Sequence, residues 1–370
     1  MDEITRIFID TSKTVFQLHG VNAVEAVVLK RQLPRGRMVE FFSKLPATMI
    51  GLEACGGSHH WARVLGALGH EVKLIAPQHV KPYVKRGKND ANDAAGGCEA
   101  MSRPTMGFVP IKTAEQQAAL MLAGVREAIV RERTRLTNMI RGHAAEFGMV
   151  APKGLCKIEP LLARMAEDQT LPSLARELFA QLGGAYAEIQ VRFEAVDAKL
   201  LTWHRANALS VALAEIPGVG PIGASLLVMK APDPKLFGSG RQFAAWLGLT
   251  PKDHSTAGKV RLGVITRAGD EGLRSVLVAG ATSVIKMART GKGAGASPWL
   301  IALLKRKEPK LAAVALANKI ARIAWVMMTT GEAYDARRTA TVICPNPPTV
   351  SLPSVDVELA RSRWWDRSIR

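Results

Sequence analysis

The chain has 370 residues, enough for two or three domains, and its 48% hydrophobic content can fill ordinary cores. Lysine and arginine outnumber aspartate and glutamate by 50 to 32, and the formal net charge of +18 predicts a polyanionic partner, nucleic acid before an anionic membrane. No stretch approaches the roughly 20 uninterrupted apolar residues of a membrane span, and the first residues lack the order of a secretion signal. We therefore expect a cytoplasmic protein that binds nucleic acid.

The first third of the chain has the pattern of an α/β domain. The expected elements are strands at 4–10, 15–20, 26–29, 48–53 and 72–75, and helices at 37–45 and 58–68. The first three strands are joined tightly, which favours an antiparallel meander, and the last two flank a helix, which favours parallel pairing. This order is that of an RNase H-like sheet, in which the first and fourth strands lie side by side.

Four acidic residues stand out because each lies where a carboxylate is costly. Asp10 and Glu53 each follow the apolar run of an expected strand, and pairing of those strands would bring them together. Asp90 and Asp93 begin an expected helix and share one of its faces. Such a cluster repels itself unless a divalent cation neutralises it, and Mg²⁺ prefers oxygen ligands with open positions for phosphate. The pattern predicts a Mg²⁺ site, with Mn²⁺ as a substitute, that acts on nucleic acid.

The middle of the chain is helical and basic. One continuous helix is expected from 113 to 146, and a helical region from 159 to 205 with breaks at Pro172 and at Gly183-Gly184. Arginines recur along the first helix, which is typical of a solvated surface, a coiled-coil dimer arm or a nucleic-acid cradle.

The C-terminal third contains the run Ile216-Pro-Gly-Val-Gly-Pro. It predicts a helix-hairpin-helix, in which Gly218 and Gly220 let backbone N–H groups approach a phosphate; an ordinary helix turn is the alternative. Ser239 is expected to cap a helix over 239–247. The rest is expected to be a loop at 250–269, helices at 270–290 and 308–330, and an irregular tail from 339.

Seven segments, in order over residues 4–335, resemble bacterial transposases of the insertion sequence 110 family, most closely its 1111 group. They are Ile9-Asp10-Thr-Ser-Lys, Leu52-Glu53-Ala-Cys-Gly-Gly-Ser-His-His-Trp-Ala-Arg, Lys88-Asn-Asp90-Ala-Asn-Asp93-Ala, Ile216-Pro-Gly-Val-Gly, Phe243-Ala-Ala-Trp-Leu-Gly-Leu-Thr-Pro, His254-Ser255-Thr-Ala-Gly-Lys and Ala317-Asn-Lys-Ile-Ala-Arg-Ile-Ala-Trp.

This resemblance implies an α/β plus all-α protein. Its parts would be an N-terminal RNase H-like (RuvC-like) domain over 1–112, a helical or coiled-coil connector over 113–208, a C-terminal helical transposase domain with the helix-hairpin-helix over 209–335, and an irregular basic tail over 336–370. The family is directed by a non-coding RNA from the element, which pairs with donor and target DNA. A homodimer or homotetramer, associated with the nucleoid when bound to DNA, is implied as well.

The resemblance also assigns the chemistry. Matched position by position, Asp10, Glu53, Asp90 and Asp93 form a DEDD metal site, and Ser255 is the nucleophile that holds a cleaved strand covalently. Because Asp10 and Ser255 belong to different domains, that site must be assembled, within one chain or between protomers. The segment departs from the common Ser-Ser-Gly-Gly at its second and third positions, which makes Thr256 a rival nucleophile.

The basic residues next to these motifs are candidate contacts to DNA or guide RNA. They are Lys81, Lys85, Arg86, Lys88, Arg131, Arg133, Arg135, Arg141, Lys259, Arg261, Arg267, Lys305, Arg306, Lys319 and Arg322. A solvated surface is the alternative for each. Cys55 with His59 and His60 allows a zinc site, but a helix start packed beneath Glu53 is the simpler interpretation.

Two other functions fit parts of the pattern. A RuvC-like junction nuclease would hydrolyse DNA with water as the nucleophile and would be indifferent to Ser255. A non-catalytic architectural protein would bind DNA or RNA through the basic helices, but it would leave four clustered acids without a purpose.

Overall fold

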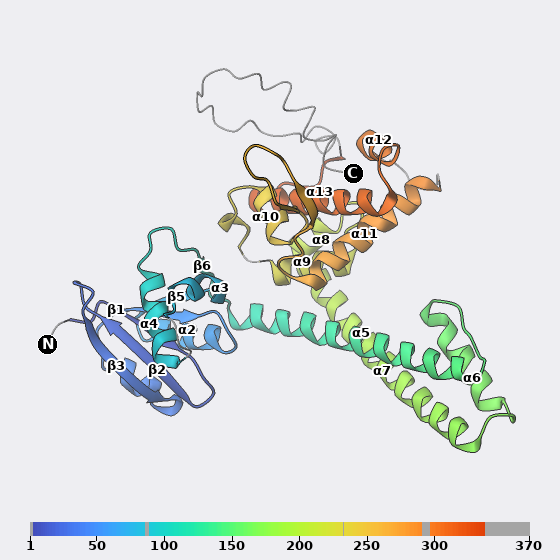
Figure 1. Cartoon of the computed structure of the whole chain (residues 1–370), viewed down its shortest axis with the longest axis horizontal. Coiled ribbons are helices and arrows are strands. Elements are labelled where there is room, and N and C mark those ends of the chain that lie inside the picture. Colours follow the sequence, from blue (N-terminus) through green and yellow to red (C-terminus); the bar gives the residue numbers. More distant parts are fainter. Residues whose placement is uncertain (1–2, 86–88, 232, 291–296, 337–370) are drawn as a thin grey trace. The chain divides into compact units, whose positions relative to one another are not determined.

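The computed structural model describes residues 3–85, 89–231, 233–290 and 297–336. The chain divides into two compact units, Met1–Ala119 and Leu120–Arg370, and each is described by itself (Figure 1).

The first unit contains a six-stranded sheet with the order β3-β2-β1-β4-β5-β6. The strands are β1 (Arg6–Asp10), β2 (Val15–Val21), β3 (Val27–Pro34), β4 (Met49–Glu53), β5 (Glu71–Ile75) and β6 (Phe108–Val109). Antiparallel pairing of β1 with β2 and of β2 with β3 confirms the predicted meander. Parallel pairing of β1 with β4 and of β4 with β5 confirms the predicted neighbours.

Two boundaries in this sheet differ from the sequence prediction. β3 runs five residues beyond the expected end, because it is an edge strand whose polar residues Lys30, Arg31 and Gln32 face solvent and break the apolar pattern. β6 was not predicted, since two residues carry too little pattern to mark a strand.

Helices cover both faces of the sheet. They are α1 (Met38–Phe42), α2 (Ser58–Ala67), α3 (Pro77–Val80) and α4 (Asp90–Met101), with 3₁₀ turns η1 (Arg35–Arg37) and η2 (Lys81–Tyr83). Because strand side chains alternate, Ile7 and Ile9 pack with α1 and α2 on one face, while Phe8 packs with α4 on the other. A Cβ added to Gly97 of α4 would lie 2.2 Å from the Phe8 ring, so this glycine lets the helix approach the sheet.

The second unit includes an arm of three helices with the 3₁₀ turn η3 (Leu155–Lys157). The helices are α5 (Ala114–Glu146), whose first six residues belong to the first unit, α6 (Ile158–Glu167) and α7 (Ser173–Ala206). Apolar side chains such as Ile140, Met165 and Tyr186 form its core. The expected break at Gly183-Gly184 is wrong: α7 runs through both glycines. Each glycine lowers helix stability by about 1 kcal/mol relative to alanine, and the packing of the buried Phe179 and Tyr186 on either side offsets this cost.

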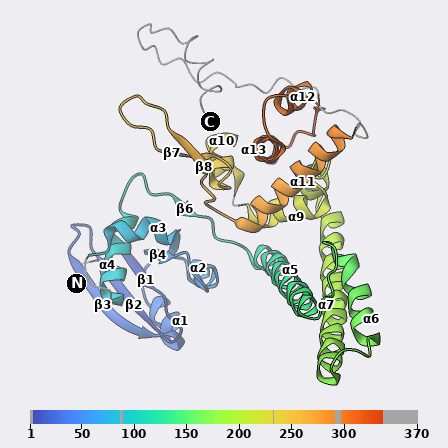
Figure 2. The ribbon, with the colours of Figure 1, turned by 45° about the vertical axis from the view of Figure 1, so that its right-hand side comes forward.

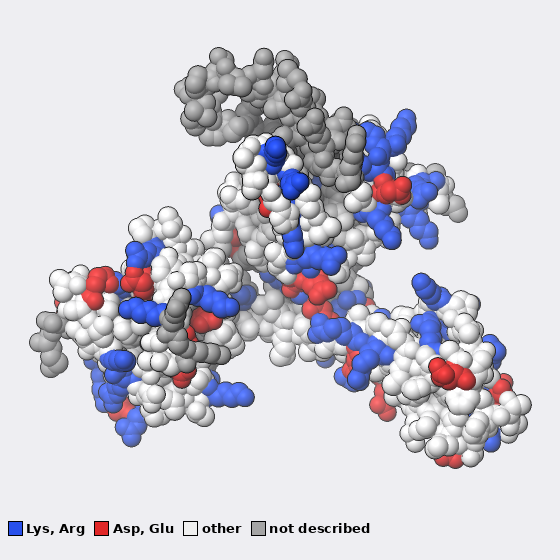
Figure 3. Space-filling model, in the orientation of Figure 1, with Lys and Arg blue, Asp and Glu red and all other residues white. Residues whose placement is uncertain are grey.

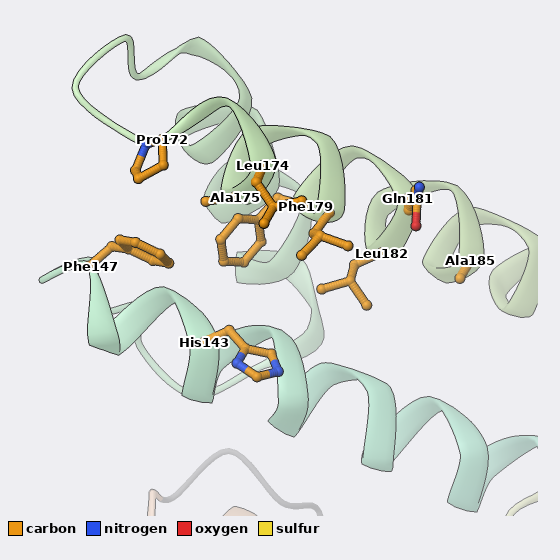
Figure 4. Close-up of a pocket in the computed structure, with 10 residues that line it drawn as sticks. His143, Phe147, Pro172, Leu174, Ala175, Phe179, Gln181, Leu182 and Ala185 are labelled. Atoms are coloured by element: carbon orange, nitrogen blue, oxygen red, sulfur yellow. The ribbon is translucent and has the colours of Figure 1, made fainter.

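The arm also holds a pocket of about 700 Å³ between α5 and α7. Figure 4 shows His143 of α5 and Phe147, which directly follows α5, facing Phe179 and Leu182 of α7. Its lining contains neither a carboxylate nor a hydroxyl, so this pocket is not suited to hydrolytic or phosphoryl-transfer chemistry.

The rest of the second unit, as far as it is described, consists of helices and one hairpin. Its elements are α8 (Ala208–Leu213), α9 (Pro221–Lys230), η4 (Pro234–Leu236), α10 (Gly240–Trp246), β7 (Pro251–Asp253), β8 (Leu262–Ile265), α11 (Glu271–Arg289), α12 (Pro298–Leu304) and α13 (Pro309–Thr330). The expected loop at 250–269 is wrong, because β7 and β8 pair antiparallel there. The helix cap at Ser239 is confirmed: its Oγ accepts the Gln242 N–H.

α13 is long and apolar enough to cross a membrane by length and composition alone. Its buried face, which includes Leu316, Ile320 and Ala324, packs against α10 and α11. This packing is that of a core helix of a globular unit.

Candidate metal centre and serine hairpin

Three carboxylates converge at one edge of the six-stranded sheet. Oxygens of Asp10, Asp90 and Asp93 all lie within 4.8 Å of one another. Asp10 ends β1 on the same face as Phe8, and α4, which brings Asp90 and Asp93, packs on that face. Glu53 ends β4 beside Asp10, one residue beyond the Ile9–Leu52 pair, but it lies outside the tight group of three.

The start of α4 orients its two acids. Asn89 is the N-cap, and its side chain accepts the Asn92 N–H at 2.8 Å. Asp90 occupies the first turn together with Asp93. Because the two are three residues apart, they share a helix face, and the positive end of the helix dipole stabilises both.

The clustered carboxylates repel one another. Burial, followed by the charges of Asp90, Asp93 and Glu53, raises the pKa of Asp10 to about 6. Burial and the charge of Asp93 also raise the pKa of Glu53. Glu53 therefore belongs to the cluster electrostatically, although its oxygens lie outside the tight group. Crowded carboxylate oxygens, partly buried at Asp10 and Asp93 and exposed at Asp90, are a donor set that a hard divalent cation fits.

The histidines beside Glu53 have a structural role. Nδ1 of His59 accepts the Lys112 N–H at 3.2 Å, and its Nε2 lies 3.1 Å from Lys112 Nζ. Burial and the charges of Lys112 and Arg63 lower the pKa of His59 to about 4. Within the described ranges, Cys55, His59 and His60 form no metal-binding group. The zinc alternative has no support, and His59 instead ties the start of α2 to Lys112, two residues before α5.

Ser255 lies in the hairpin of β7 and β8, which Figure 2 shows as an extended ribbon. Ser255 is exposed, its N–H donates to Asp253 Oδ1 at 2.8 Å, and its Oγ accepts the Arg261 N–H at 3.1 Å. Hydrogen bonds from the Ser255 side chain and backbone lower the pKa of Asp253, so this carboxylate stays ionised at neutral pH. Sequence reasoning missed Asp253, although its position two residues before a serine is the signal of such a turn.

The residue after Ser255 begins a tight turn. Thr256 and Lys259 exchange backbone hydrogen bonds of 3.3 and 2.9 Å across it. Ala257 and Gly258 occupy the two central positions with φ of +48° and +76°. Such a turn favours glycine at both positions, so Ala257 is strained there.

Both ends of the hairpin are fixed to the helical core. Nη1 of the buried Arg274 donates to Leu247 O at 3.2 Å and to Ala268 O at 2.8 Å. Glycines occupy the base of the hairpin because two backbone segments lie in contact there. A Cβ on Gly248 would lie 2.3 Å from Ala268 O, and one on Gly269 would lie 2.0 Å from Trp246 O. The base is therefore rigid, and the exposed tip carries Ser255.

Two family models match the chain. The DEDD transposase model of the IS110 group, described as a transposase, matches residues 8–148, and a second, described as the transposase IS116/IS110/IS902 family, matches residues 210–294. The chain is also 67% identical, over 90% of its length and 86% of the relative's, to the putative transposase y4pF/y4sB of Sinorhizobium fredii. The chain belongs to the IS110 family of transposases.

Further relatives agree. Over 90% of this transposase, identity is 44% to a probable family 20 transposase of Pseudomonas aeruginosa, of which 98% is covered. It is 36% to the transposase for insertion sequence element IS1111A of Coxiella burnetii, of which 92% is covered. The latter supports the 1111 group. As a transposase the chain is a DNA-cleaving and rejoining enzyme, and its DEDD domain suggests the use of a divalent metal.

The basic residues singled out in the sequence are of two kinds in this transposase. Figure 3 shows lysine and arginine on the visible faces of both units. The exposed candidates are Lys81, Lys85, Arg131, Arg135, Lys259, Arg261, Arg267, Lys305 and Arg306. Arg133 and Arg141 instead hold the arm together, bonding to Gln190 and to the carbonyls of Pro152 and Gly154. Lys319 lies over the Trp299 ring, Arg322 is half-buried, and Arg86, Lys88 and residues 337–370 lie outside the described residues.

The glycine-rich turn between α8 and α9 has a packing role. Gly218 has φ of +90°, and a Cβ on Gly280 of α11 would lie 1.8 Å from its carbonyl oxygen. Gly280 is therefore required for the close packing of the turn against α11, and the positive φ favours glycine at 218. Gly220, at the start of α9, is exposed and has open space around it.

Proposed function

We propose that this transposase recombines DNA through a Mg²⁺ site formed by Asp10, Glu53, Asp90 and Asp93. The observation that supports this most is the convergence of three carboxylates from β1 and α4 within 4.8 Å, beside the end of β4. The strand order β3-β2-β1-β4-β5 supports our proposal that residues 1–112 form an RNase H-like (RuvC-like) domain. Mn²⁺ would substitute for Mg²⁺ at an all-oxygen site.

We propose Ser255 as the nucleophile. Its Oγ would attack a DNA phosphorus, and the bridging oxygen of the cleaved strand would leave. The bound cation would neutralise charge that develops on the phosphate oxygens. A serine hydroxyl is weakly nucleophilic at neutral pH. We propose that the ionised Asp253, which accepts the Ser255 backbone N–H, would also accept the hydroxyl proton. The resulting phosphoserine would conserve the energy of the broken linkage, so rejoining would need no external energy source.

The remaining parts of the proposal concern partners. The connector over 113–208 would be a coiled-coil arm, and the domain over 209–335 would hold DNA backbones through the helix-hairpin-helix at Gly218 and Gly220 and through the exposed basic residues. A non-coding RNA of the element would select donor and target DNA by base pairing, with the protein gripping the backbone. A homodimer or homotetramer would provide the sites that two DNA segments require.

Trapping of covalent protein–DNA adducts tests the nucleophile. Ser255→Ala should abolish adducts, and Thr256→Ala should retain them. Ser283→Ala is the matched control, because Ser283 is exposed in the same unit and bonds only its own helix. Adducts that persist in Ser255→Ala and vanish in Thr256→Ala would transfer the role to Thr256. Cleavage with free ends and no adduct in the unmodified protein would instead favour a hydrolytic nuclease.

Sequencing of the RNA that co-purifies with the full chain tests the guide. We expect one RNA species from the same element, with segments complementary to both DNA partners. DNA exchange that survives complete ribonuclease treatment would remove the guide from the proposal and leave the metal and serine chemistry to be judged separately.

A further inference from the structure

The edge of the sheet that carries Asp10 and Glu53, here called the acidic edge, also carries an unusual arginine. β2 runs antiparallel to both β1 and β3, so β3 ends at the edge where β1 ends. Arg35 follows directly, and its N–H donates to Thr14 O at 2.8 Å, which extends the ladder by one step. Arg35 is therefore fixed by its backbone at the acidic edge.

The guanidinium of Arg35 lies over two aromatic rings. Its Cζ is 5.6 Å from the centre of Phe16 and 5.3 Å from that of Trp61. Both rings are buried in the core beneath it, so they form a fixed platform. Cation–π contact of this kind holds the planar group in place without using its N–H donors.

Those donors are free for a ligand. Within the parts of the chain that the structure describes, no carboxylate or other hydrogen-bond acceptor contacts the Arg35 side chain. By contrast, Arg6 and Arg103 of the same unit are paired with Glu25 and Glu99. An exposed, oriented and unpaired guanidinium matches the two oxygens of a phosphodiester.

We propose that Arg35 binds a backbone phosphate of the DNA strand that is cleaved at the acidic edge. The inference rests on the proposed function, because that function places the strand there. The exposed Lys13, in the turn directly after β1, adds positive potential on the path between Arg35 and Asp10.

The register of the sheet fixes which phosphate is in reach. Asp10 pairs with Gln17, and Gln17 pairs with Gln32, so Arg35 lies two strands across from Asp10 and three residues further out. With about 4.8 Å between strands and about 3.3 Å per residue, the two backbones are roughly 14 Å apart. Asp10 faces α4, whereas the Arg35 guanidinium lies over Phe16 and Trp61 on the face covered by α2, so the strand would pass around the end of the sheet between them. At about 3.4 Å of helix rise per phosphate on one strand, Arg35 would therefore contact a phosphate about four or more nucleotides from the cleaved bond.

Salt-dependent DNA binding by the full chain tests this contact. The probes are a mixed-sequence duplex DNA and a duplex RNA of equal length, measured in EDTA so that cleavage plays no part. Arg35→Gln should reduce the slope of log affinity against log salt by about 0.9 for DNA. The ratio of unmodified to variant DNA affinity should therefore fall about threefold between roughly 50 and 200 mM salt. RNA binding should not change. Lys44→Gln is the control, because exposed Lys44 already pairs with Glu40.

Two further variants make the test decisive. Arg35→Lys keeps the positive charge but loses the paired N–H donors of the guanidinium and its stacking on the rings. It should therefore weaken DNA binding while the salt slope is retained. This variant keeps the test usable if Arg35→Gln fails to fold. Neutral methylphosphonates, placed singly along a cleavable DNA, should weaken wild-type binding about four or more nucleotides from the cleaved bond and leave Arg35→Gln insensitive there. An unchanged DNA slope in Arg35→Gln, or an equal loss for RNA, would overturn the inference. Normal cleavage by Asp10→Asn would instead overturn the proposed function, since the EDTA experiment does not depend on cleavage.

Discussion

Asp10 and Glu53 end two neighbouring parallel strands in register, each one residue beyond the Ile9–Leu52 pair. Their side chains share the face on which α4 packs, because strand side chains alternate and Phe8 and Gly51 meet α4 residues there. A helix that begins above this point needs only two acids in its first turn to complete a cluster. The sheet and one helix thus assemble the site with no long loop.

The negative charge of Asp10 should lower the free energy of unfolding of the metal-free protein. Its pKa of about 6 exceeds the ordinary 3.8, so between these values the folded protein binds a proton more tightly than the unfolded chain. The free energy of unfolding should therefore fall as pH rises through this window, by roughly 1 kcal/mol after allowance for solvent screening. Asp10→Asn should lack this slope and be more stable at neutral pH. Thermal unfolding in EDTA measures it; an identical slope in both proteins would contradict the repulsion.

Gly97→Ala should displace α4 from the sheet. The new methyl would meet the Phe8 ring at 2.2 Å, and the cost should be about 1–3 kcal/mol of unfolding free energy. Because α4 carries Asp90 and Asp93, divalent-metal affinity should fall as well. Gly66→Ala in α2 is the control: its Cβ would have open space, and helix propensity should make it neutral or stabilising. Equal stability of the two variants would refute the close packing of α4.

Arg274→Met should loosen the serine hairpin. It removes two hydrogen bonds from a charged donor to the carbonyls of Leu247 and Ala268, at a cost of about 3 kcal/mol. Hydrogen exchange at residues 250–266 should accelerate, and adduct formation at Ser255 should slow. Arg289→Met is the control, on an exposed position of the same helix. Unaltered exchange in the hairpin would show that Arg274 does not anchor it.

Ala257→Gly should relax the turn that follows Ser255. The alanine has φ of +48°, which costs an L-residue about 1 kcal/mol and costs glycine nothing. Amide exchange around Thr256 and Lys259 should slow by a few-fold in the variant. Faster exchange would mean that the lost chain stiffness outweighs the relieved strain.

Much of the first unit could be predicted from the sequence because its signals are local. The apolar runs before Asp10 and Glu53, and the i, i+3 spacing of Asp90 and Asp93, define both the elements and the shared face. The hairpin that carries Ser255 could not be predicted in this way. Its strands have three and four residues and are mostly exposed, so they lack an apolar alternation.

Contacts between residues far apart in the chain could not be predicted from the sequence pattern either. Arg274 reaches Leu247 across 27 positions, and the Arg35 platform combines Phe16 with Trp61, which only the folded sheet and α2 bring together. The motif at Gly218 predicts phosphate contact, which stays a prediction, but it gave no sign that Gly280, 62 residues later, packs against this turn. A pattern can indicate what a glycine permits, whereas only the fold shows what approaches it.

Mn²⁺ binding to the full chain, measured by electron paramagnetic resonance, tests the metal centre most directly. We expect the unmodified protein to bind Mn²⁺ in competition with Mg²⁺, and Asp10→Asn and Asp93→Asn each to lose that binding. Glu71→Gln, which removes an equal charge from an exposed pair with Lys73, should bind as the unmodified protein does. Unchanged Mn²⁺ affinity in both aspartate variants would contradict a cation site at the acidic edge.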